Sequence, residues 1–203
     1  MCVKIMYQLV TIFDTETSGL PVRPSKYKRY ADPFEETNLY ANARLVEIAY
    51  VTYMVNKENN ERVLLDQRSM LVIPTDFQIT NSSIHGISHE MANTYGYSIH
   101  NVLEHFMDVV KRSDILVCHN ADFDKNIVGA ELVKNNYIDC AKYFFSKTFA
   151  CTMKIATEKY KMQRFPTLQA LYNLIGSSHL HSWEQQHRAM DDTQRTTECY
   201  FKL

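Results

Sequence analysis

The chain has 203 residues, of which 45% are hydrophobic and 22% charged, and its formal net charge at pH 7 is -1. This length predicts one domain, residues 1–203, with a sizeable core, and the charge excludes a uniformly basic protein that wraps nucleic acid. Five cysteines without CxxC spacing favour reduced thiols over a disulfide framework. The apolar run that ends at Asp14 is too short to span a membrane and has no cleavage site after it. We therefore expect a soluble, intracellular protein of the cytoplasm or nucleus.

Five apolar segments predict β-strands, because each is short and rich in β-branched or aromatic residues. They are residues 7–13, 45–55, 63–73, 115–118 and 147–151. The polar stretch 56–61 contains Asn59 and Asn60, and it predicts a hairpin between the second and third strands.

Helical spacing of apolar residues occurs between and after the later strands. In residues 97–112 the apolar positions recur every three or four residues, as Val102, Phe106 and Val109 illustrate. Similar patterns predict helices over residues 124–134, 152–160, 167–175 and 188–203. Alternating strands and helices predict an α/β fold, in which functional sites gather at strand ends and at the helix starts beside them.

Residues 21–42 form a segment of a different kind, with three prolines and little periodicity, which we interpret as a loop insertion. The segment carries a run of basic and aromatic side chains: Arg23, Lys26, Tyr27, Lys28, Arg29 and Tyr30. Two interpretations stay open. The run is either an ordinary solvated loop or a flap beside the first acidic block that contacts phosphates and stacks bases.

Acidic residues gather in three short blocks that lie far apart in the sequence. Asp14 and Glu16 follow the first strand, residues 119–124 follow the fourth, and residues 187–192 open the last helix. On an extended segment, Asp14 and Glu16 point to the same face. Acids that share a pocket resist ionising together, and divalent cations remove this cost. Two cations held by shared carboxylates can drive attack on a phosphodiester, so the pattern predicts a metal-dependent phosphodiesterase.

The residue pattern alone does not decide which acids of the second and third blocks take part. Asp122 and Asp124 are both candidates in the second block. In the third block helical geometry favours Asp191, because residues four apart share a helix face and His187 lies four residues earlier. Asp192 is the alternative.

In this order and with these gaps, the blocks resemble the motifs of the DEDDh 3′–5′ exonuclease family. That family includes the proofreading exonuclease subunit of bacterial replicative DNA polymerase. The likeness lies in Asp-Thr-Glu-Thr-Ser-Gly at 14–19, His-Asn-Ala-Asp-Phe-Asp at 119–124 and His-Arg-Ala-Met-Asp-Asp at 187–192. The string Ile-His-Gly-Ile at 84–87 is a fourth similarity, and the resemblance spans residues 10–196.

The resemblance implies an RNase H-like fold, with a mixed five-stranded sheet, three of its strands antiparallel, and helices on both faces. It selects Asp124 and Asp192. It also implies that Asp14, Glu16 and Asp192 hold one Mg²⁺ or Mn²⁺, and that Asp14 and Asp124 hold a second. His187 would take a proton from the attacking water, since histidine titrates near working pH. Five residues match family positions that line the pocket for the last nucleotide: Thr17, Leu20, His85, Asn120 and Phe123.

The activity that the resemblance implies is the release of 5′-mononucleotides from the 3′ end of single-stranded DNA. Trimming of RNA 3′ ends stays an alternative, because the motifs recognise the phosphodiester and not the sugar. A catalytically inactive scaffold is a weaker alternative. A polymerase partner is compatible with the motifs but is not indicated by them.

Plainer interpretations stay open for several of the matched residues. His85 is either a substrate contact or a turn histidine beside Gly86. Asn120 either contacts substrate or caps the following helix, and Phe123 either lines the pocket or belongs to the core. A zinc site is disfavoured, because no cysteine pair accompanies its candidate ligands His179, His181, His187 and Cys199.

Overall fold

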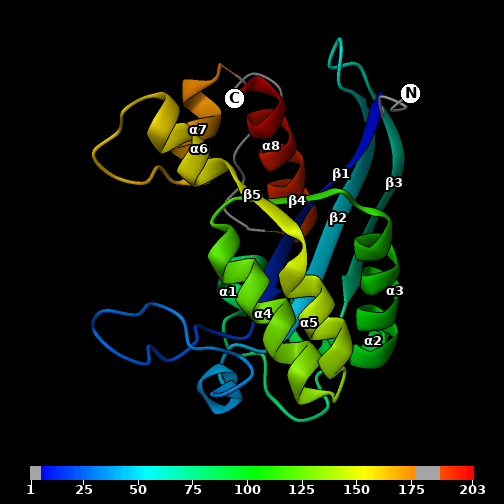
Figure 1. Cartoon of the computed structure of the whole chain (residues 1–203). Helices are drawn as coiled ribbons and strands as arrows, with labels where there is room; N and C mark the ends of the chain where they lie inside the picture. Colours follow the sequence, from blue (N-terminus) through cyan, green and yellow to red (C-terminus); the bar gives the residue numbers. More distant parts are fainter. Residues whose placement is uncertain (1–5, 177–187) are drawn as a thin grey trace.

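A five-stranded sheet lies at the centre of the protein, which is represented by a computed structural model that describes residues 6–176 and 188–203 (Figure 1). The strand order is β3-β2-β1-β4-β5. The strands are β1 (Tyr7–Thr17), β2 (Leu45–Asn56), β3 (Arg62–Leu71), β4 (Ile115–Cys118) and β5 (Thr148–Cys151). β1, β2 and β3 are antiparallel to one another in turn, whereas β4 and β5 run parallel to β1. The predicted mixed sheet with three antiparallel strands is confirmed.

The first strand is longer than predicted. The sequence predicts a strand that stops at Phe13, but β1 continues to Thr17 and pairs with β2 along this extra length. Asp14 lies opposite Ala49, and Glu16 lies opposite Glu47. The apolar pattern underestimates the strand because polar residues break it, while the length of β2 provides pairing partners beyond it. The first acids therefore lie within the central strand and not after it.

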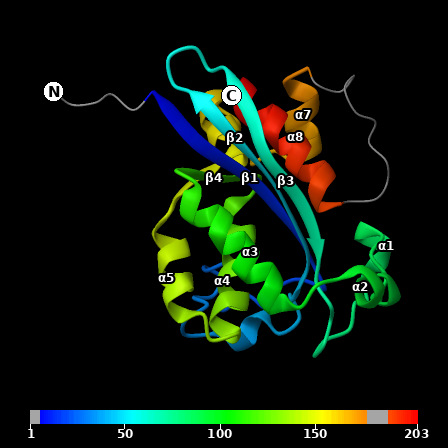
Figure 2. The same cartoon turned by 90° about the vertical axis from the view of Figure 1, so that its right-hand side faces the viewer.

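Helices cover both faces of the sheet, as predicted. Their bounds are η1 (Thr37–Tyr40), α1 (Ser82–His85), α2 (His89–Tyr95), α3 (Ile99–Arg112), α4 (Ala121–Lys134), α5 (Ile138–Ser146), α6 (Thr152–Lys159), α7 (Leu168–Leu174) and α8 (Ala189–Lys202). Figure 2 shows α3, α4 and α5 on one side of the sheet and α8, with α7 beside it, on the other. This layered arrangement agrees with the predicted α/β class.

Helix boundaries differ from the predicted ones where capping decides them. Ser98 accepts a hydrogen bond from the N–H of Asn101, so α3 begins at Ile99 and not at 97. α4 begins at Ala121, three residues earlier than predicted. The sequence analysis missed α1, α2 and α5, because all three are short, with four, seven and nine residues.

The core has two main parts, one on each face of the sheet. Phe13 packs with Phe106 and Phe144 beneath α3 and α5, with ring centroids 5.0 and 6.4 Å from its own. Ile12 points to the opposite face, where Val51 of β2 and Tyr200 of α8 belong to the same apolar cluster. Since side chains alternate along a strand, Asp14 and Glu16 share the face of Ile12 and point toward α8.

The sequence predicts reduced cysteines and no membrane-spanning segment, and the structure describes both features. Cys118, Cys140, Cys151 and Cys199 are free thiols. Among residues 6–176 and 188–203, no helix is both long enough and apolar enough to cross a membrane.

Candidate active site

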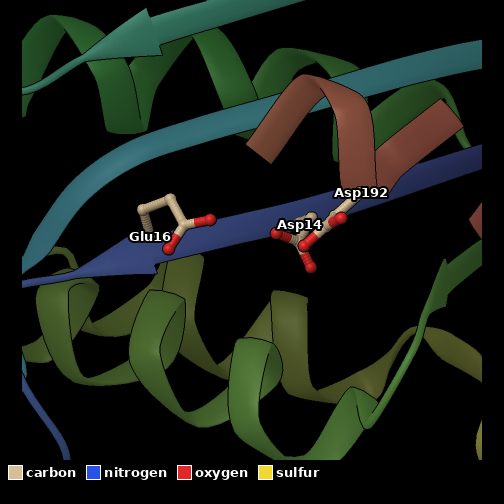
Figure 3. A group of neighbouring side chains, drawn as sticks. All are labelled: Asp14, Glu16 and Asp192. Carbon is tan, nitrogen blue, oxygen red and sulfur yellow. The ribbon is translucent and has the colours of Figure 1, made fainter. Parts of the chain in front are cut away.

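Three carboxylates from two distant parts of the chain meet at one point. Asp14 and Glu16 lie on β1 and Asp192 lies in the first turn of α8; one oxygen of each lies within 4.8 Å of the others. Figure 3 shows Asp192 reaching from α8 toward Asp14, with Glu16 farther along β1. Asp192 is 8% exposed, whereas Asp191 is exposed. Geometry therefore brings Asp192 and not Asp191 to the cluster, because α8 begins only at Ala189 and Arg188 before it is extended.

The second block contributes Asp124. This side chain is 2% exposed, and its Oδ1 accepts hydrogen bonds from the N–H and the hydroxyl of Thr15 at 3.1 and 2.8 Å. The last residue of β1 that pairs with β4 is Ile12, so Asp124 takes the N–H of Thr15 beyond the end of that pairing. Asp122 instead lies at the surface and forms an ion pair with Lys154 at 2.7 Å. Asp124 thus adjoins β1 but is not one of the three carboxylates whose oxygens gather.

The acids of the site repel one another. Burial, followed by the charges of Asp124 and Asp192, raises the pKa of Asp14 well above its ordinary value. Burial and the neighbouring acid Asp192 raise the pKa of Glu16 to about 8. Burial also raises the pKa of Asp124 to about 7, although hydrogen bonds from Thr15 oppose this change. A divalent cation would relieve the repulsion, and an all-oxygen donor set is the type that Mg²⁺ and Mn²⁺ prefer. The residues present therefore fit such a metal.

A fifth acid, Glu47, was missed by the sequence analysis. It is fully buried on β2, and it accepts hydrogen bonds from Arg188 at 2.7 and 3.1 Å, from the Ser69 hydroxyl at 2.6 Å and from the N–H of Ala189 at 3.1 Å. Burial raises its pKa, but the hydrogen bonds from Arg188 and Ser69 outweigh this and leave it below the ordinary value. Glu47 thus ties β2 to the start of α8. The available signal was a single acid within the apolar run 45–55.

Three of the residues predicted to contact substrate lie in different environments. Thr17 ends β1 with 7% exposure, and its hydroxyl donates to the carbonyl of Gly19 at 2.7 Å. Leu20 is 76% exposed. His85 has no exposed surface, and its Nδ1 accepts the N–H of Ile87 at 3.1 Å, as the turn-histidine alternative requires. The substrate contact of His85 stays a prediction.

His85 nevertheless has an indirect connection to the end of β1. Its Nε2 lies 3.2 Å from the Oδ1 of Asn81. The Asn81 amide nitrogen donates to the carbonyl oxygen of Thr17 at 2.8 Å. A buried histidine thus orients the asparagine that holds the last residue of the acid-bearing strand.

Asn120 and Phe123 lie together at the start of α4. Asn120 adopts a left-handed conformation with φ 65° and makes no side-chain cap, so the capping interpretation is wrong. Its side chain lies close enough to Tyr30 of the 21–42 segment to oppose the rise that burial causes in the pKa of that hydroxyl. Phe123 is partly buried against the core, and its ring centroid lies 6.3 Å from that of Tyr30. Phe123 therefore contacts both the core and the 21–42 segment.

The predicted base, His187, lies outside the described residues. His179 and His181 of the disfavoured zinc site also lie outside them. The fourth candidate zinc ligand, Cys199, is fully buried against Ala156 and Leu171.

Comparison with known proteins adds a family and a fold. Residues 11–200 match the family model described as Exonuclease (RNase_T). No curated protein matches the sequence. Among solved structures, E. coli Exonuclease I in complex with a dA13 oligonucleotide is similar with a TM-score of 0.68 and 14% identity, covering 96% of this chain and 40% of that one. The chain therefore spans only about two fifths of that exonuclease.

Two further structures are similar over most of this chain. A 3′-exonuclease with 3′-end specific recognition of histone mRNA stem-loop has a TM-score of 0.64 and 14% identity, and the match covers 98% of this chain and 82% of that one. Cell-death related nuclease 4 has a TM-score of 0.60 and 14% identity, with 97% and 64% covered. At such identities the likeness concerns the fold alone, and it confirms the predicted RNase H-like architecture.

Proposed function

The chain belongs to the exonuclease family, and from this premise we propose that it is a metal-dependent exonuclease that removes 5′-mononucleotides from the 3′ end of single-stranded DNA. The observation that carries the proposal is the convergence of Asp14, Glu16 and Asp192, with oxygens within 4.8 Å of one another. These acids come from the two ends of the matched region, so only the folded domain assembles them.

The acids have separate tasks in this proposal. Asp14, Glu16 and Asp192 hold one Mg²⁺ or Mn²⁺, and Asp14 with Asp124 holds a second. Bound divalent ions would stabilise charge on the attacking and leaving oxygens of the phosphodiester. Thr15 keeps Asp124 beside β1 through its N–H and hydroxyl.

The remaining chemistry belongs to the residue that precedes Arg188 in the sequence. We assign His187 as the general base, with a ring nitrogen that accepts a proton from the attacking water. Arg188 follows it directly and is held by Glu47 at 2.7 Å, which restrains the chain next to the base. The same contact holds the first turn of α8, where Asp192 lies.

RNA is the second candidate substrate. The match to the 3′-exonuclease with 3′-end specific recognition of histone mRNA stem-loop covers 82% of that chain, against 40% of E. coli Exonuclease I. Because the match covers most of the 3′-exonuclease that recognises an RNA, RNA 3′ ends stay an alternative substrate. The acids do not discriminate between the two, since discrimination rests on contacts with the 2′-hydroxyl.

A time course on 5′-labelled oligonucleotides tests the proposal. Single-stranded DNA and RNA of matched sequence are each incubated with Mg²⁺, Mn²⁺ or EDTA. We expect a ladder that shrinks from the 3′ end only with metal, and the faster substrate identifies the preferred sugar. Asp192→Asn should abolish the ladder, whereas Asp191→Asn, the matched control, should not.

The outcomes separate the candidate functions. Degradation in EDTA, or full activity of the Asp192→Asn protein, would contradict the metal assignment. No degradation of either substrate by a folded wild-type protein would favour the inactive scaffold.

A further inference from the structure

The 21–42 segment has an anchored half and a projecting half. Ala31 is 3% exposed, and its carbonyl accepts the hydroxyl of Tyr40 at 2.7 Å. The ring of Phe34 packs on Phe145 with a centroid distance of 5.6 Å, and Phe145 lies against Gly129 of α4, where a Cβ would come within 2.4 Å of the ring. Residues 31–40 are therefore fixed to the domain, and Figure 1 shows the preceding residues as a loop that projects beside α4.

Tyr30 stands where the projecting half meets the anchored half. It precedes the buried Ala31, so its backbone position is restrained. Its ring contacts Phe123 of α4 at a centroid distance of 6.3 Å. The Arg29 guanidinium lies 5.3 Å from the centroid of the same ring.

The surroundings of Tyr30 belong to the acidic site. Burial raises the pKa of its hydroxyl, and the charges of Asp124 and Asp122 add to this effect. Asp124 is the acid that hydrogen-bonds with Thr15 of β1. Because the Tyr30 ring contacts Phe123, it lies at the start of α4, next to the residue that precedes Asp124.

The geometry favours stacking on one side of the ring. Tyr30 and Phe123 are in mutual contact with an interplanar angle of 59°, so a base does not fit between them. Tyr30 is only partly buried, which leaves part of its ring for a planar ligand. Aromatic rings beside cationic groups are the usual means by which proteins bind the bases of single strands.

We propose that Tyr30 forms a wall of the pocket for the 3′-terminal nucleotide and stacks on its base, while Arg29 contacts a phosphate. This inference rests on the proposed function and names the part of the substrate that the 21–42 segment recognises. It differs from a general flap of positive charge, because one residue makes a contact that depends on the base. Tyr27 of the same segment provides a matched comparison, since it is 87% exposed and contacts Lys26.

The test compares two oligonucleotides that differ only in whether the 3′-terminal residue carries a base or is abasic. Tyr30→Ala should raise KM for the normal oligonucleotide by on the order of 5- to 10-fold with little change in kcat, as expected for loss of one base–aromatic stack. The same variant should leave KM for the abasic oligonucleotide nearly unchanged. Tyr30→Phe keeps the ring and should retain most of the preference, and Tyr27→Ala should retain all of it.

Binding provides a second measurement that does not need activity. Fluorescence anisotropy without divalent ions should show a preference of the wild-type protein for the oligonucleotide with a terminal base, and Tyr30→Ala should lose that preference. Equal weakening on both oligonucleotides, or no weakening on either, would overturn the inference. Failure of the proposed function is distinct, because the wild-type protein would then bind the oligonucleotides but degrade neither.

Discussion

At the scale of single residues, the acids of the site destabilise the folded protein when no metal is bound. Asp14 and Glu16 lie side by side on one face of β1, and Asp192 closes the group from α8. Burial and mutual repulsion raise the pKa values of Asp14 and Glu16. Ionising such groups at neutral pH costs folding free energy, which a bound cation would return.

We predict that the stability of the metal-free protein depends on these acids. The pKa of Glu16 in the folded protein is about 8, above its ordinary value of 4.5, so between these values the folded state binds protons that the unfolded state does not. The contribution of Glu16 to the free energy of unfolding should therefore fall as pH rises from about 5 to 8. In EDTA at pH 8, Glu16→Gln should be more stable than the wild type by roughly 1–2 kcal/mol, a discounted value because the side chain is partly solvated.

Thermal unfolding of both proteins at several pH values measures this difference. Burial also lowers the pKa of His85 and His119, so their contribution to the free energy of unfolding rises with pH. This contribution is common to both proteins, and it cancels in the difference between variant and wild type. The stability advantage of Glu16→Gln over the wild type should shrink toward pH 5. With Mn²⁺ the wild type should become the more stable protein, since Glu16→Gln loses a metal ligand. Asp191→Asn serves as the control. A gap that does not change with pH would contradict the repulsion argument.

At the scale of elements, the contact between β2 and α8 decides whether the acids meet. Glu47 receives four hydrogen bonds, which come from β3, from Arg188 and from the first N–H of α8. It faces Glu16 across the β1–β2 pairing. The helix that carries Asp192 is thus fixed to the strand beside the one that carries Asp14 and Glu16.

We predict that Glu47→Ala destabilises the protein by about 3 kcal/mol, because Arg188 and the N–H of Ala189 lose their buried acceptor. This is at the low end of the range for a broken buried pair, since the Arg188 side chain is 35% exposed. Glu47→Gln keeps the shape and should cost less. We expect it to lower kcat by at least about tenfold while KM changes little, because a small displacement of Asp192 disturbs the acid geometry.

Urea unfolding and steady-state kinetics check this prediction. Ser69→Ala removes one hydrogen bond to Glu47 without touching α8, and it should reduce stability with little effect on kcat. If Glu47→Gln and Ser69→Ala have equal effects on kcat, Glu47 supports only the fold and does not position the site.

At the scale of the whole molecule, the net charge of -1 hides an uneven distribution. The basic run at 23–29 lies in the loop that projects beside α4, the helix that carries Asp124, and it contrasts in sign with the acids (Figure 1). Such an arrangement attracts a nucleic-acid strand to one end of the domain without making the whole protein basic.

We predict that neutralising the basic run reduces the salt dependence of single-strand binding. Replacing Arg23, Lys26, Lys28 and Arg29 by Gln should weaken binding and lower the slope of log K against log salt by about 0.7 for each phosphate that the variant no longer neutralises. Anisotropy titrations at several NaCl concentrations, without divalent ions, provide the slope. A control variant carries the same number of changes on the β2–β3 hairpin, α3, α5 and α6: Lys57, Lys111, Lys142 and Lys159 to Gln. Equal slopes for the two variants would favour the interpretation of the segment as an ordinary solvated loop.

Prediction from the sequence was most successful where the pattern is local. All five strands were identified because buried strands leave short apolar runs, and the acidic blocks carry family motifs within six residues each. Prediction failed for β1 beyond Phe13 and for α1, α2 and α5. Pairing with β2 extends the strand through polar residues, and short helices depend on tertiary packing more than on their own pattern.

The sequence by itself determined the kind of protein: an α/β domain of the exonuclease family, with acids in three blocks that suit divalent metal. Only the tertiary structure decided which neighbours those acids have. The Glu47–Arg188 pair joins residues 141 positions apart, and the contact between Tyr30 and Phe123 joins a loop to a helix far along the chain. The periodicity of apolar residues predicts which face of a helix or strand is buried, but it contains no information on which distant element packs on that face. That choice is made by packing of the whole domain.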